Sequence, residues 1–484
     1  MDRIGSPSAG HFTRIAPRQI LAHERGFAIT IALAFFALAT MPLWSPLLMP
    51  TAAAYILLLY NIYWAAQALY SSLAGLTSYR RMQAWTKVDW RAYYDVLGQT
   101  VQQVVVLPNY RERIEVMRDT LERLAQSDYP CAQLNVVLAM EAREDDALAK
   151  AEQLRAQFAG RFGHFWITAH PLAPDETAGK GANLTYAVRY VQRQADELGW
   201  DAARVMITTI DADTRLHPQY LAALAVQFWN APNRTRKFFQ GVLLLLNNVW
   251  DVHAPIRVFS AFWSFTYLTG VTHYQRMTTA VYSMSLRLLD DAGYWDPRVV
   301  AEDGHIFFRA FFALRGTVDI EPIYLPISLN AVQSRDLWQA LRQQYRQMMR
   351  WTWTASNLPF IADQWRRHTE IPLARKIKKC LPYFEGLLVL PASWYIITFG
   401  VLLLPLINSA APLQVFGLPL TMLAPLILSP TAVGVVVALG INLKLRAQYA
   451  PRPRPVSRRY RVAQWAEWLL LLFAAVVYFG VPYA

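Results

Sequence analysis

Two long stretches of the chain carry no charged side chain. Residues 26–79 and 386–443 contain no Asp, Glu, Lys or Arg. Each is long enough for two membrane crossings, because a spanning helix needs about 20 apolar residues. The prolines within them, together with an apolar run near the C-terminus, predict five spans, at residues 27–48, 52–76, 384–407, 412–443 and 468–481. The fourth span is expected to be kinked or partly re-entrant, because Pro419, Pro425 and Pro430 interrupt it.

The composition agrees with a membrane protein and excludes other classes. Hydrophobic residues make up 54% of the chain and charged residues 17%, whereas soluble proteins average about 25% charged residues. An aromatic content of 13% excludes a disordered chain. Cys131 and Cys380 are the only cysteines, which excludes a disulfide framework and a cysteine-based zinc site.

Basic residues beside the spans predict their orientation and explain the net charge of +13. Short basic flanks mark the cytoplasmic side of a membrane. Residues 1–25, residues 80–385 and the acid-free segment 444–461 are therefore expected to be cytoplasmic, and the C-terminus to be outside. Much of the excess charge thus lies where it attracts anionic lipid headgroups, and nucleic-acid binding is not expected.

The segment between the charge-free stretches has the pattern of an α/β domain. Short apolar runs alternate with helical patterns: the runs are residues 101–107, 134–140, 165–169 and 205–210, and the helices are residues 112–126, 145–158 and 182–197. This rhythm predicts a mostly parallel sheet. Ligands of such sheets bind at the carboxyl ends of the strands, so the residues that follow each strand are candidates for the site.

The predicted organisation has five parts. A cytoplasmic N-terminal segment (residues 1–25) and a transmembrane hairpin (26–79) precede a cytoplasmic α/β domain with interfacial helices (80–360). A basic interfacial linker (361–385) then leads to a C-terminal transmembrane region (386–484) of about three spans, with the basic loop 444–461.

Two motifs in the α/β segment suggest the chemistry. The run 205–210 leads directly into Asp211 and Asp213, and two carboxylates so placed can share a divalent cation with a diphosphate. Alone, this pair is as readily an ordinary acidic turn. Gln347, Arg350 and Trp351 are spaced to share one face of a helix. An Arg fork suits a diphosphate and an indole suits the face of a sugar, although an amphipathic helix at a membrane boundary shows the same pattern.

With Ala301-Glu302-Asp303 between them, these motifs resemble the DxD, TED and QxxRW motifs of membrane-integrated family-2 glycosyltransferases, a group that includes cellulose, chitin and hyaluronan synthases. Residues 105–112, 179–184 and 293–296 are similar to further family segments, so the resemblance covers about residues 100–360. It implies a GT-A fold with a Rossmann-like nucleotide-binding half, inserted between transmembrane helices. It also implies a nucleotide-diphosphate sugar donor, with a UDP-sugar expected, a Mg²⁺ or Mn²⁺ ion, and inversion at the anomeric carbon.

The resemblance assigns roles to individual residues. Asp303 would be the general base that takes a proton from the acceptor hydroxyl, and the alternative for it is a helix N-cap. Asp211 and Asp213 would hold the metal ion. The acceptor sugar would contact Glu302, Gln347 and Trp351. The nucleotide would contact Pro108, Tyr110, Glu112, Glu141, Lys180, Asp211 and Arg350.

Three positions depart from the family pattern. Ala301 stands where a Thr is usual, and Glu141 stands where many relatives have Asp, so that an ordinary surface acid is its alternative reading. Residues 279–285 contain no Gly, although the family has a Gly-rich acceptor loop there. In addition, the gating loop of cellulose synthases has no match in the sequence.

The expected function is extension of a polysaccharide on the cytoplasmic side of the plasma (bacterial inner) membrane, coupled to its passage through the protein's own helices. Two alternatives stay open: transfer of a single sugar to a polyprenyl-phosphate or other lipid, and a non-catalytic membrane scaffold with a degenerate transferase domain. The scaffold is disfavoured because every acidic and basic catalytic position is filled. Accessory subunits are not predicted by any feature of the sequence.

The predicted orientation is testable with tags. A tag at the N-terminus and one near Pro453 should be inaccessible from outside the cell, whereas a tag at Ala484 should be accessible, because five spans place the two ends on opposite sides. Protease or label accessibility in intact cells measures this. A cytoplasmic tag at Ala484 would mean that residues 412–443 cross twice or that residues 468–481 do not span.

Overall fold

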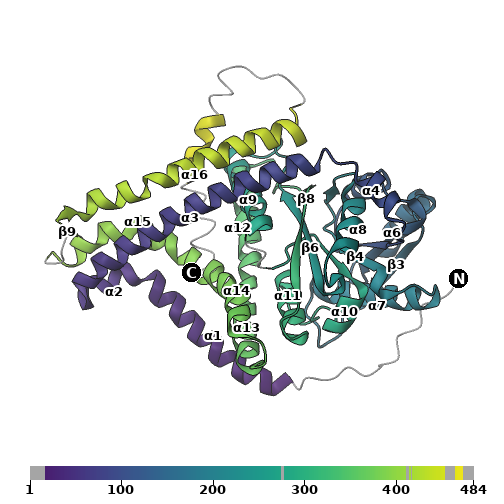
Figure 1. The fold of residues 1–484 in the computed structure, drawn as a ribbon, viewed down its shortest axis with the longest axis horizontal. Coiled ribbons are helices and arrows are strands. Elements are labelled where there is room, and N and C mark those ends of the chain that lie inside the picture. Colours follow the sequence, from purple (N-terminus) through teal and green to yellow (C-terminus); the bar gives the residue numbers. More distant parts are fainter. Residues whose placement is uncertain (1–16, 274–276, 410–413, 416, 453–463, 472–484) are drawn as a thin grey trace.

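The computed structural model describes residues 17–273, 277–409, 414–415, 417–452 and 464–471. An arm of long helices lies beside an α/β domain, with α12, α13 and α14 between them (Figure 1). The charge-free stretches form the arm, and the segment with alternating strand and helix patterns forms the domain.

The domain is built on an eight-stranded sheet in the order β3-β2-β1-β4-β7-β6-β8-β5. Strands β3, β2, β1 and β4 are parallel neighbours, β7 is antiparallel to both of its neighbours, and β6 pairs in parallel with β8. The strands are β1 (Gln102–Asn109), β2 (Leu134–Glu141), β3 (Phe165–His170), β4 (Val205–Thr209), β5 (Arg215–Leu216), β6 (Lys237–Leu244), β7 (Tyr282–Ser285) and β8 (Asp319–Ser328). The predicted mostly parallel sheet, with its first four strands, is confirmed.

Helices cover both faces of the sheet, which is why its central strands are apolar on both sides. Successive residues of β1 alternate between two cores: Val105 packs in one, and Val104 and Val106 pack in the other. The first core contains α4 (Trp90–Leu97), α5 (Ile114–Ala125), α6 (Ala147–Phe158) and α8 (Tyr220–Asn230). The second contains α7 (Lys180–Glu197), α10 (Leu286–Ala292) and α11 (Glu302–Ala313). The helices predicted at residues 112–126, 145–158 and 182–197 correspond to α5, α6 and α7.

Four further helices lie between the sheet and the arm. They are α9 (Ala254–His273), α12 (Leu337–Thr352), α13 (Asn357–Arg367) and α14 (Leu373–Phe384). Helix α9 packs against both β6 and the arm helix α3. Short turns of other helix types lie at Cys131–Gln133, Ala159–Arg161, Ala202–Arg204, Arg234–Arg236, Trp353–Ser356, Glu385–Val389 and Glu467–Leu470.

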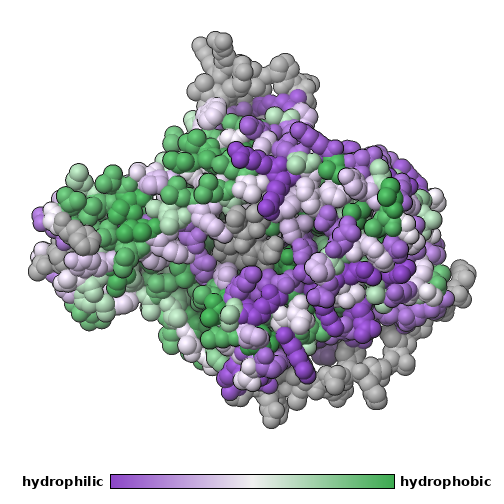
Figure 2. Space-filling view, in the orientation of Figure 1, coloured by the Kyte–Doolittle hydropathy of each residue, from purple (hydrophilic) through white to green (hydrophobic). Residues whose placement is uncertain are grey.

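The arm consists of α1 (Pro17–Ala39), α2 (Met41–Leu48), α3 (Pro50–Trp85), α15 (Leu390–Ile407) and α16 (Leu420–Tyr449), with the short strands β9 (Gln414–Val415) and β10 (Leu418–Pro419) near its end. In the described residues, three helices are long and apolar enough to cross a membrane: Pro50–Trp85, Leu373–Ile407 and Leu420–Tyr449. A bent pair of helices in the first 48 residues would make a fourth. Apolar side chains are exposed along the arm, whereas the surface of the α/β domain is mostly hydrophilic (Figure 2).

The expected spans differ from these helices in two respects. Residues 27–48 do not form one straight helix, because Glu24–Ala39 and Met41–Leu48 meet at 73°. Pro42, in the first turn of α2, favours a new helix start at this point. The helix expected at 384–407 begins earlier, since α14 continues through a π-helical turn, Glu385–Val389, into α15.

The span expected at residues 52–76 lies within α3, and the last two expected spans lie toward the C-terminus. Within residues 412–443 the structure has one helix, α16, which contains Pro425 and Pro430 and is long enough for one crossing. Most of the fifth run, residues 468–481, lies outside the described residues.

Candidate active site

The loop after β4 gathers contacts from three strand ends. The N–H of Asp211 donates to Thr214 Oγ1 at 2.9 Å, which closes a tight turn. The N–H of Asn330, just after β8, donates to Asp213 Oδ2 at 2.8 Å, and Asn247, just after β6, donates to the carbonyl of Asp213 at 2.8 Å. The position of Asp213 is therefore set by strands β4, β6 and β8 together.

Lys180 is the first residue of α7 and points toward this loop. Its Nζ lies 2.6 Å from Asp211 Oδ1 and donates to the carbonyl of Ala280 at 3.1 Å. Gly181 follows because the N-terminus of α7 approaches α11 closely: a Cβ there would lie 2.9 Å from the Cβ of Glu302. The predicted Gly-Lys segment is thus brought against both predicted acidic motifs.

Asp303 lies in the first turn of α11, where its carboxylate is held by two backbone N–H groups. Ala280 donates to Oδ2 at 3.2 Å and Gly304 donates to Oδ1 at 2.8 Å. Thr278 also donates through its hydroxyl to the carbonyl of Asp303. The N-cap residue of α11 is Ala301, so Asp303 does not cap this helix.

The segment around Ala280 explains part of the departure from a Gly-rich loop. Ala280 has a φ of +48°, a left-handed conformation that favours glycine and that other residues adopt at a cost. This conformation directs the N–H of Ala280 to Asp303 and its carbonyl to Lys180. A single strained residue therefore links the base candidate to the lysine.

The electrostatics of the site favour an added cation. Burial, with the nearby Asp211, raises the pKa of Asp213 to about 7. Burial, with the neighbouring Asp303, likewise raises the pKa of Glu302 to about 8. Burial alone would lower the pKa of Lys180, but Asp211 and Glu302 outweigh it and raise that pKa. Lys180 thus stays charged, while Asp213 and Glu302 resist ionisation.

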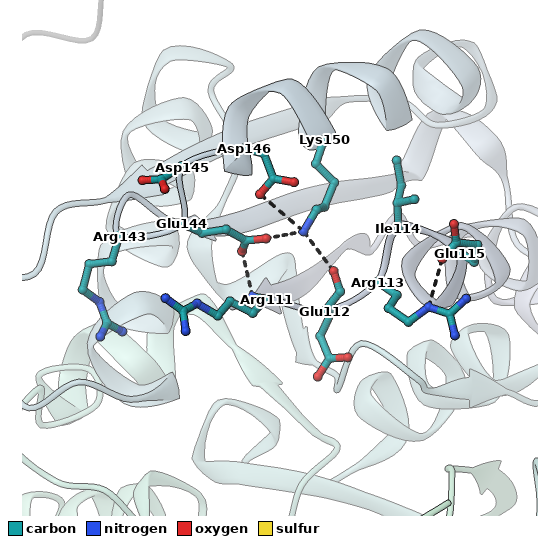
Figure 3. A pocket seen from close by; sticks show the side chains of 10 residues that line it. All are labelled: Arg111, Glu112, Arg113, Ile114, Glu115, Arg143, Glu144, Asp145, Asp146 and Lys150. Carbon is teal, nitrogen blue, oxygen red and sulfur yellow. Dashed lines mark hydrogen bonds and ion pairs between the residues drawn. The ribbon is translucent and has the colours of Figure 1, made fainter. Parts of the chain in front are cut away.

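The loop after β1 forms one wall of an open hollow of about 580 Å³ (Figure 3). Glu144 holds this loop: it accepts from Asn109 Nδ2 at 2.8 Å and from the N–H of Arg111 at 2.7 Å, and it pairs with Lys150. The carboxylate of Glu112 points away from Lys150 (Figure 3), and Lys150 Nζ donates instead to the backbone carbonyl of Glu112 at 2.9 Å. Burial and the proximity of Asp211 raise the pKa of Glu112. The sequence did not indicate Glu144 and Lys150, and it assigned no role to Asn109, although Asn109 lies in the family-like segment 105–112.

The other residues predicted to contact the nucleotide lie around the same loop. Pro108 is half-buried within β1, and Tyr110 is exposed. The guanidinium of Arg143 lies 4.5 Å from the centre of the Tyr110 ring. Arg143 also pairs with Glu141 at 2.9 Å.

Glu141 is buried at the end of β2, so its reading as a surface acid is wrong. Burial would raise its pKa, but His170 and Arg143 outweigh burial and lower it. His170 Nδ1 lies 3.8 Å from Glu141, and its other ring nitrogen lies 2.8 Å from Glu176. A carboxylate so firmly paired is better suited to orient Arg143 than to accept a proton.

The third motif lies on α12, as its helical spacing predicted. Trp351 packs against α9, with its ring centre 5.3 Å from that of Trp263 and 6.4 Å from that of Phe259. Gln347 accepts from Gln344 Nε2 at 2.9 Å. Arg350 is exposed. Burial raises the pKa of Glu112, and the positive charge of Arg350 opposes part of that rise. Arg350 is thus the member of the motif within electrostatic reach of the loop after β1.

Two carboxylates are the protein's candidate ligands for a metal ion. Across the part of the chain that the structure describes, no three His, Cys, Asp or Glu side chains are grouped to hold one. Asp211 and Asp213 fit an ion that takes one or two carboxylates and completes its shell with phosphate oxygens and water, as Mg²⁺ does. The pKa of Asp213 shows that its ionised form lacks compensation from the protein alone.

The raised pKa of Asp213 predicts a pH-dependent stability. The folded protein keeps this proton up to about pH 7, whereas an unfolded Asp loses it near pH 4. The stability from the protonated carboxyl is therefore fully present below about pH 4 and is lost as the pH rises through about 7. Asp213→Asn, which cannot ionise, should raise the Tm in chelator, and by more at pH 8 than at pH 5.

Thermal unfolding of the detergent-solubilised protein measures this difference. Mg²⁺ should raise the Tm of the parent at pH 8 more than that of the Asn variant. An Asn variant with the parental Tm at both pH values would show that Asp213 ionises freely in the folded protein.

Comparisons with known proteins place the chain in a family. A family model described as glycosyl transferase family group 2 matches residues 206–479. A search of curated protein sequences finds no match.

Solved structures match with low TM-scores. Mannosyltransferase PcManGT from Pyrobaculum calidifontis, in complex with GDP-Man and Mn²⁺, has a TM-score of 0.40 and 16% identity, over 87% of this chain and 98% of its own. TarS 1-349 from S. aureus, in complex with UDP-GlcNAc, has a TM-score of 0.35 and 14% identity, over 74% and 95%. Glucosyl-3-phosphoglycerate synthase from M. tuberculosis has a TM-score of 0.32 and 16% identity, over 55% and 84%.

The family model covers more than half of the chain, including the segment from β4 through α12 that carries all three acidic and aromatic motifs. The chain therefore belongs to glycosyl transferase family group 2, and its α/β domain is a GT-A-type glycosyltransferase domain.

Proposed function

We propose that this glycosyltransferase uses a nucleotide-diphosphate sugar, with a UDP-sugar as the first candidate, to extend a polysaccharide at the cytoplasmic face of the plasma membrane. The observation that carries the proposal is the convergence of Lys180, Asp211 and Asp303 at the carboxyl edge of the sheet. A metal-binding acidic pair, a cation for phosphates and a fixed carboxylate are the three groups that such a transfer needs.

The donor binds, in this proposal, across the ends of β1, β2 and β4. The loop at Pro108, Tyr110 and Glu112 takes the nucleoside, with Glu141 acting through Arg143. Lys180 and Arg350 take the phosphates, since preorganised positive charge stabilises a developing anion. Of the residues proposed to contact the donor, Glu112 lines the hollow beside the loop, as does Arg143.

Asp211 and Asp213 would hold a Mg²⁺ or Mn²⁺ ion. When bound, the ion supplies positive charge that neutralises the leaving diphosphate. The chain's own contribution is to position both carboxylates: the tight turn at Thr214 fixes the backbone of Asp211, Lys180 contacts its carboxylate, and the N–H of Asn330 orients Asp213. A cation here also relieves the cost of ionising Asp213.

Asp303 is the proposed general base. The N–H groups of Ala280 and Gly304 fix its carboxylate, so its orientation does not depend on a flexible side chain. Burial raises its pKa, which brings it closer to the operating pH and makes it a better proton acceptor. The proton of the acceptor hydroxyl passes to Asp303 as that oxygen bonds to the anomeric carbon from the opposite side. The bond from the anomeric carbon to the phosphate oxygen breaks, and the nucleoside diphosphate leaves.

The acceptor end of the site faces the helical arm. Glu302, beside Asp303, and Gln347 and Trp351 on α12 are proposed to hold the acceptor sugar, with Trp351 kept in place by α9. The apolar helices α3, α15 and α16 are proposed to span the membrane, with α12 to α14 at its cytoplasmic surface. The polymer would leave through this region, and product length distinguishes a polymer from a single sugar transferred to a lipid.

The role of Asp303 is tested by Asp303→Asn, which keeps size and hydrogen-bonding capacity but removes the charge that accepts a proton. Turnover should fall by at least about 10²-fold, the lower end for losing general-base assistance. The donor KM should change little, because the donor is held by other groups, and a loss in kcat alone marks a transition-state interaction. Nucleotide release by the purified protein over a panel of UDP- and GDP-sugars measures both constants.

Two controls make the result specific. Asp303→Ala should be no more active than Asp303→Asn, and the Tm of both variants should show that the protein is folded. An Asn variant with close to the parental kcat would remove Asp303 from the mechanism. Absence of nucleotide release by the parent over the whole panel would instead favour the scaffold.

A further inference from the structure

A buried asparagine joins the helix that carries Asp303 to the helices that lead into the arm. Asn357, the first residue of α13, is 1% exposed. Its Nδ2 donates to the carbonyl of Ala301 at 3.3 Å and to the hydroxyl of Tyr383 at 3.1 Å. Its Oδ1 lies 3.0 Å from Nδ1 of His305. Both ends of the amide are therefore engaged.

The carbonyl of Ala301 fixes which way the amide of Asn357 faces, because a carbonyl can only accept and therefore takes the NH₂ group. Oδ1 of Asn357 is thereby turned toward His305. Burial lowers the pKa of His305 to about 4, so the ring is neutral at physiological pH. Because Oδ1 can only accept, Nδ1 of His305 carries the ring proton and donates it.

The carbonyl that Asn357 contacts lies immediately before the two acidic residues of the site. Ala301 is the N-cap residue of α11 and makes no side-chain capping bond, because alanine has no oxygen to offer. The contact from Asn357 thus holds a helix start that lacks the usual support of its own side chain.

Tyr383 connects this contact to the arm. It lies near the end of α14, directly before the π-helical turn that leads into α15, and its hydroxyl donates to the carbonyl of Thr354 at 3.1 Å. The packing is close: a Cβ on Gly304 would lie 2.9 Å from Met277 Sδ and 3.2 Å from the Tyr383 hydroxyl. A glycine at position 304 therefore allows the first turn of α11 to approach α14 this closely.

We propose that Asn357 and Tyr383 are positioning residues, which hold the Glu302–Asp303 turn at a fixed place relative to the membrane-proximal helix α14. This inference rests on the proposed function, since it gives Asp303 the role of base. A displacement of about 1 Å at a reacting group can cost about 10²-fold in rate. The acceptor would arrive from the arm. The contacts of Asn357 that hold Asp303 at a fixed distance from α14 would therefore also hold it at a fixed distance from the acceptor.

The test uses Asn357→Asp and Tyr383→Phe in the full chain. Asn357→Asp keeps shape and the bond from His305 but loses both donated bonds, and we expect kcat to fall at least tenfold with the donor KM within about twofold of the parent. Tyr383→Phe removes one hydroxyl, and we expect a smaller loss, about threefold to tenfold, again in kcat.

Asn135→Asp is the matched control. Asn135 is also fully buried and also donates through Nδ2 to a backbone carbonyl, that of Gln103 at 3.1 Å. It lies at the start of β2 and so at the opposite edge of the sheet from the site. Its variant should lose stability but keep the parental kcat per folded molecule.

Hydrogen exchange supplies a readout that does not depend on activity. Amides of residues 301–306 should exchange faster in Asn357→Asp than in the parent, and at the parental rate in Asn135→Asp. Parental kcat and parental exchange in Asn357→Asp would overturn the positioning role. If the parent itself releases no nucleotide, the proposed function fails, while the exchange comparison still decides whether Asn357 holds the turn.

Discussion

Mutual repulsion among carboxylates at the carboxyl edge of the sheet is the constraint on which the site depends. Asp211, Glu302 and Asp303 all lie within electrostatic reach of Lys180, and burial raises the pKa of Glu302 and of Asp303. The fold meets this cost with backbone donors to Asp213 and Asp303 and with the charge of Lys180. It meets it only in part, as the raised pKa of Asp213 shows. A divalent ion bound together with a diphosphate would compensate the negative charge of the ionised carboxylates. Binding of the donor with its ion should therefore also stabilise the folded protein.

The same constraint accounts for local features that are costly elsewhere. Gly181 allows α7 to bring Lys180 against α11, and Ala280 accepts a left-handed backbone in order to direct its N–H to Asp303. On the other side of α11, Asn357 ties the acidic turn to α14, which continues into an arm whose surface is apolar (Figures 1 and 2). The proposed donor contacts thus lie on one side of α11 and the arm lies on the other. This arrangement suits an enzyme that transfers a sugar from a water-soluble donor to an acceptor at a membrane.

Much of this arrangement could be predicted from the sequence, because it follows from periodic patterns. The strands up to β4 and the helices α5 to α7 follow from alternating apolar runs. Asp211 follows from its place at the end of a strand, whereas Lys180 is indicated only by the family resemblance of residues 179–184. Contacts between distant segments could not be predicted: Glu144 holding the loop after β1, or Asn357 reaching the carbonyl of Ala301, have no local signal. The bend between α1 and α2 was missed because hydropathy is continuous across it. The packing of Trp351 against α9 could not be predicted either, because helical spacing shows which residues share one side of a helix but not which other helix that side contacts.

Calorimetric titration of UDP and of GDP into the purified protein tests the central claim most directly, since it measures whether the acidic edge of the sheet needs a cation to bind a diphosphate. The account predicts that one of the two nucleotides binds at least tenfold more tightly with Mg²⁺ or Mn²⁺ than with a chelator, and that Asp213→Ala removes this difference. Equal affinity with and without the ion, or an unchanged metal dependence in Asp213→Ala, would contradict it.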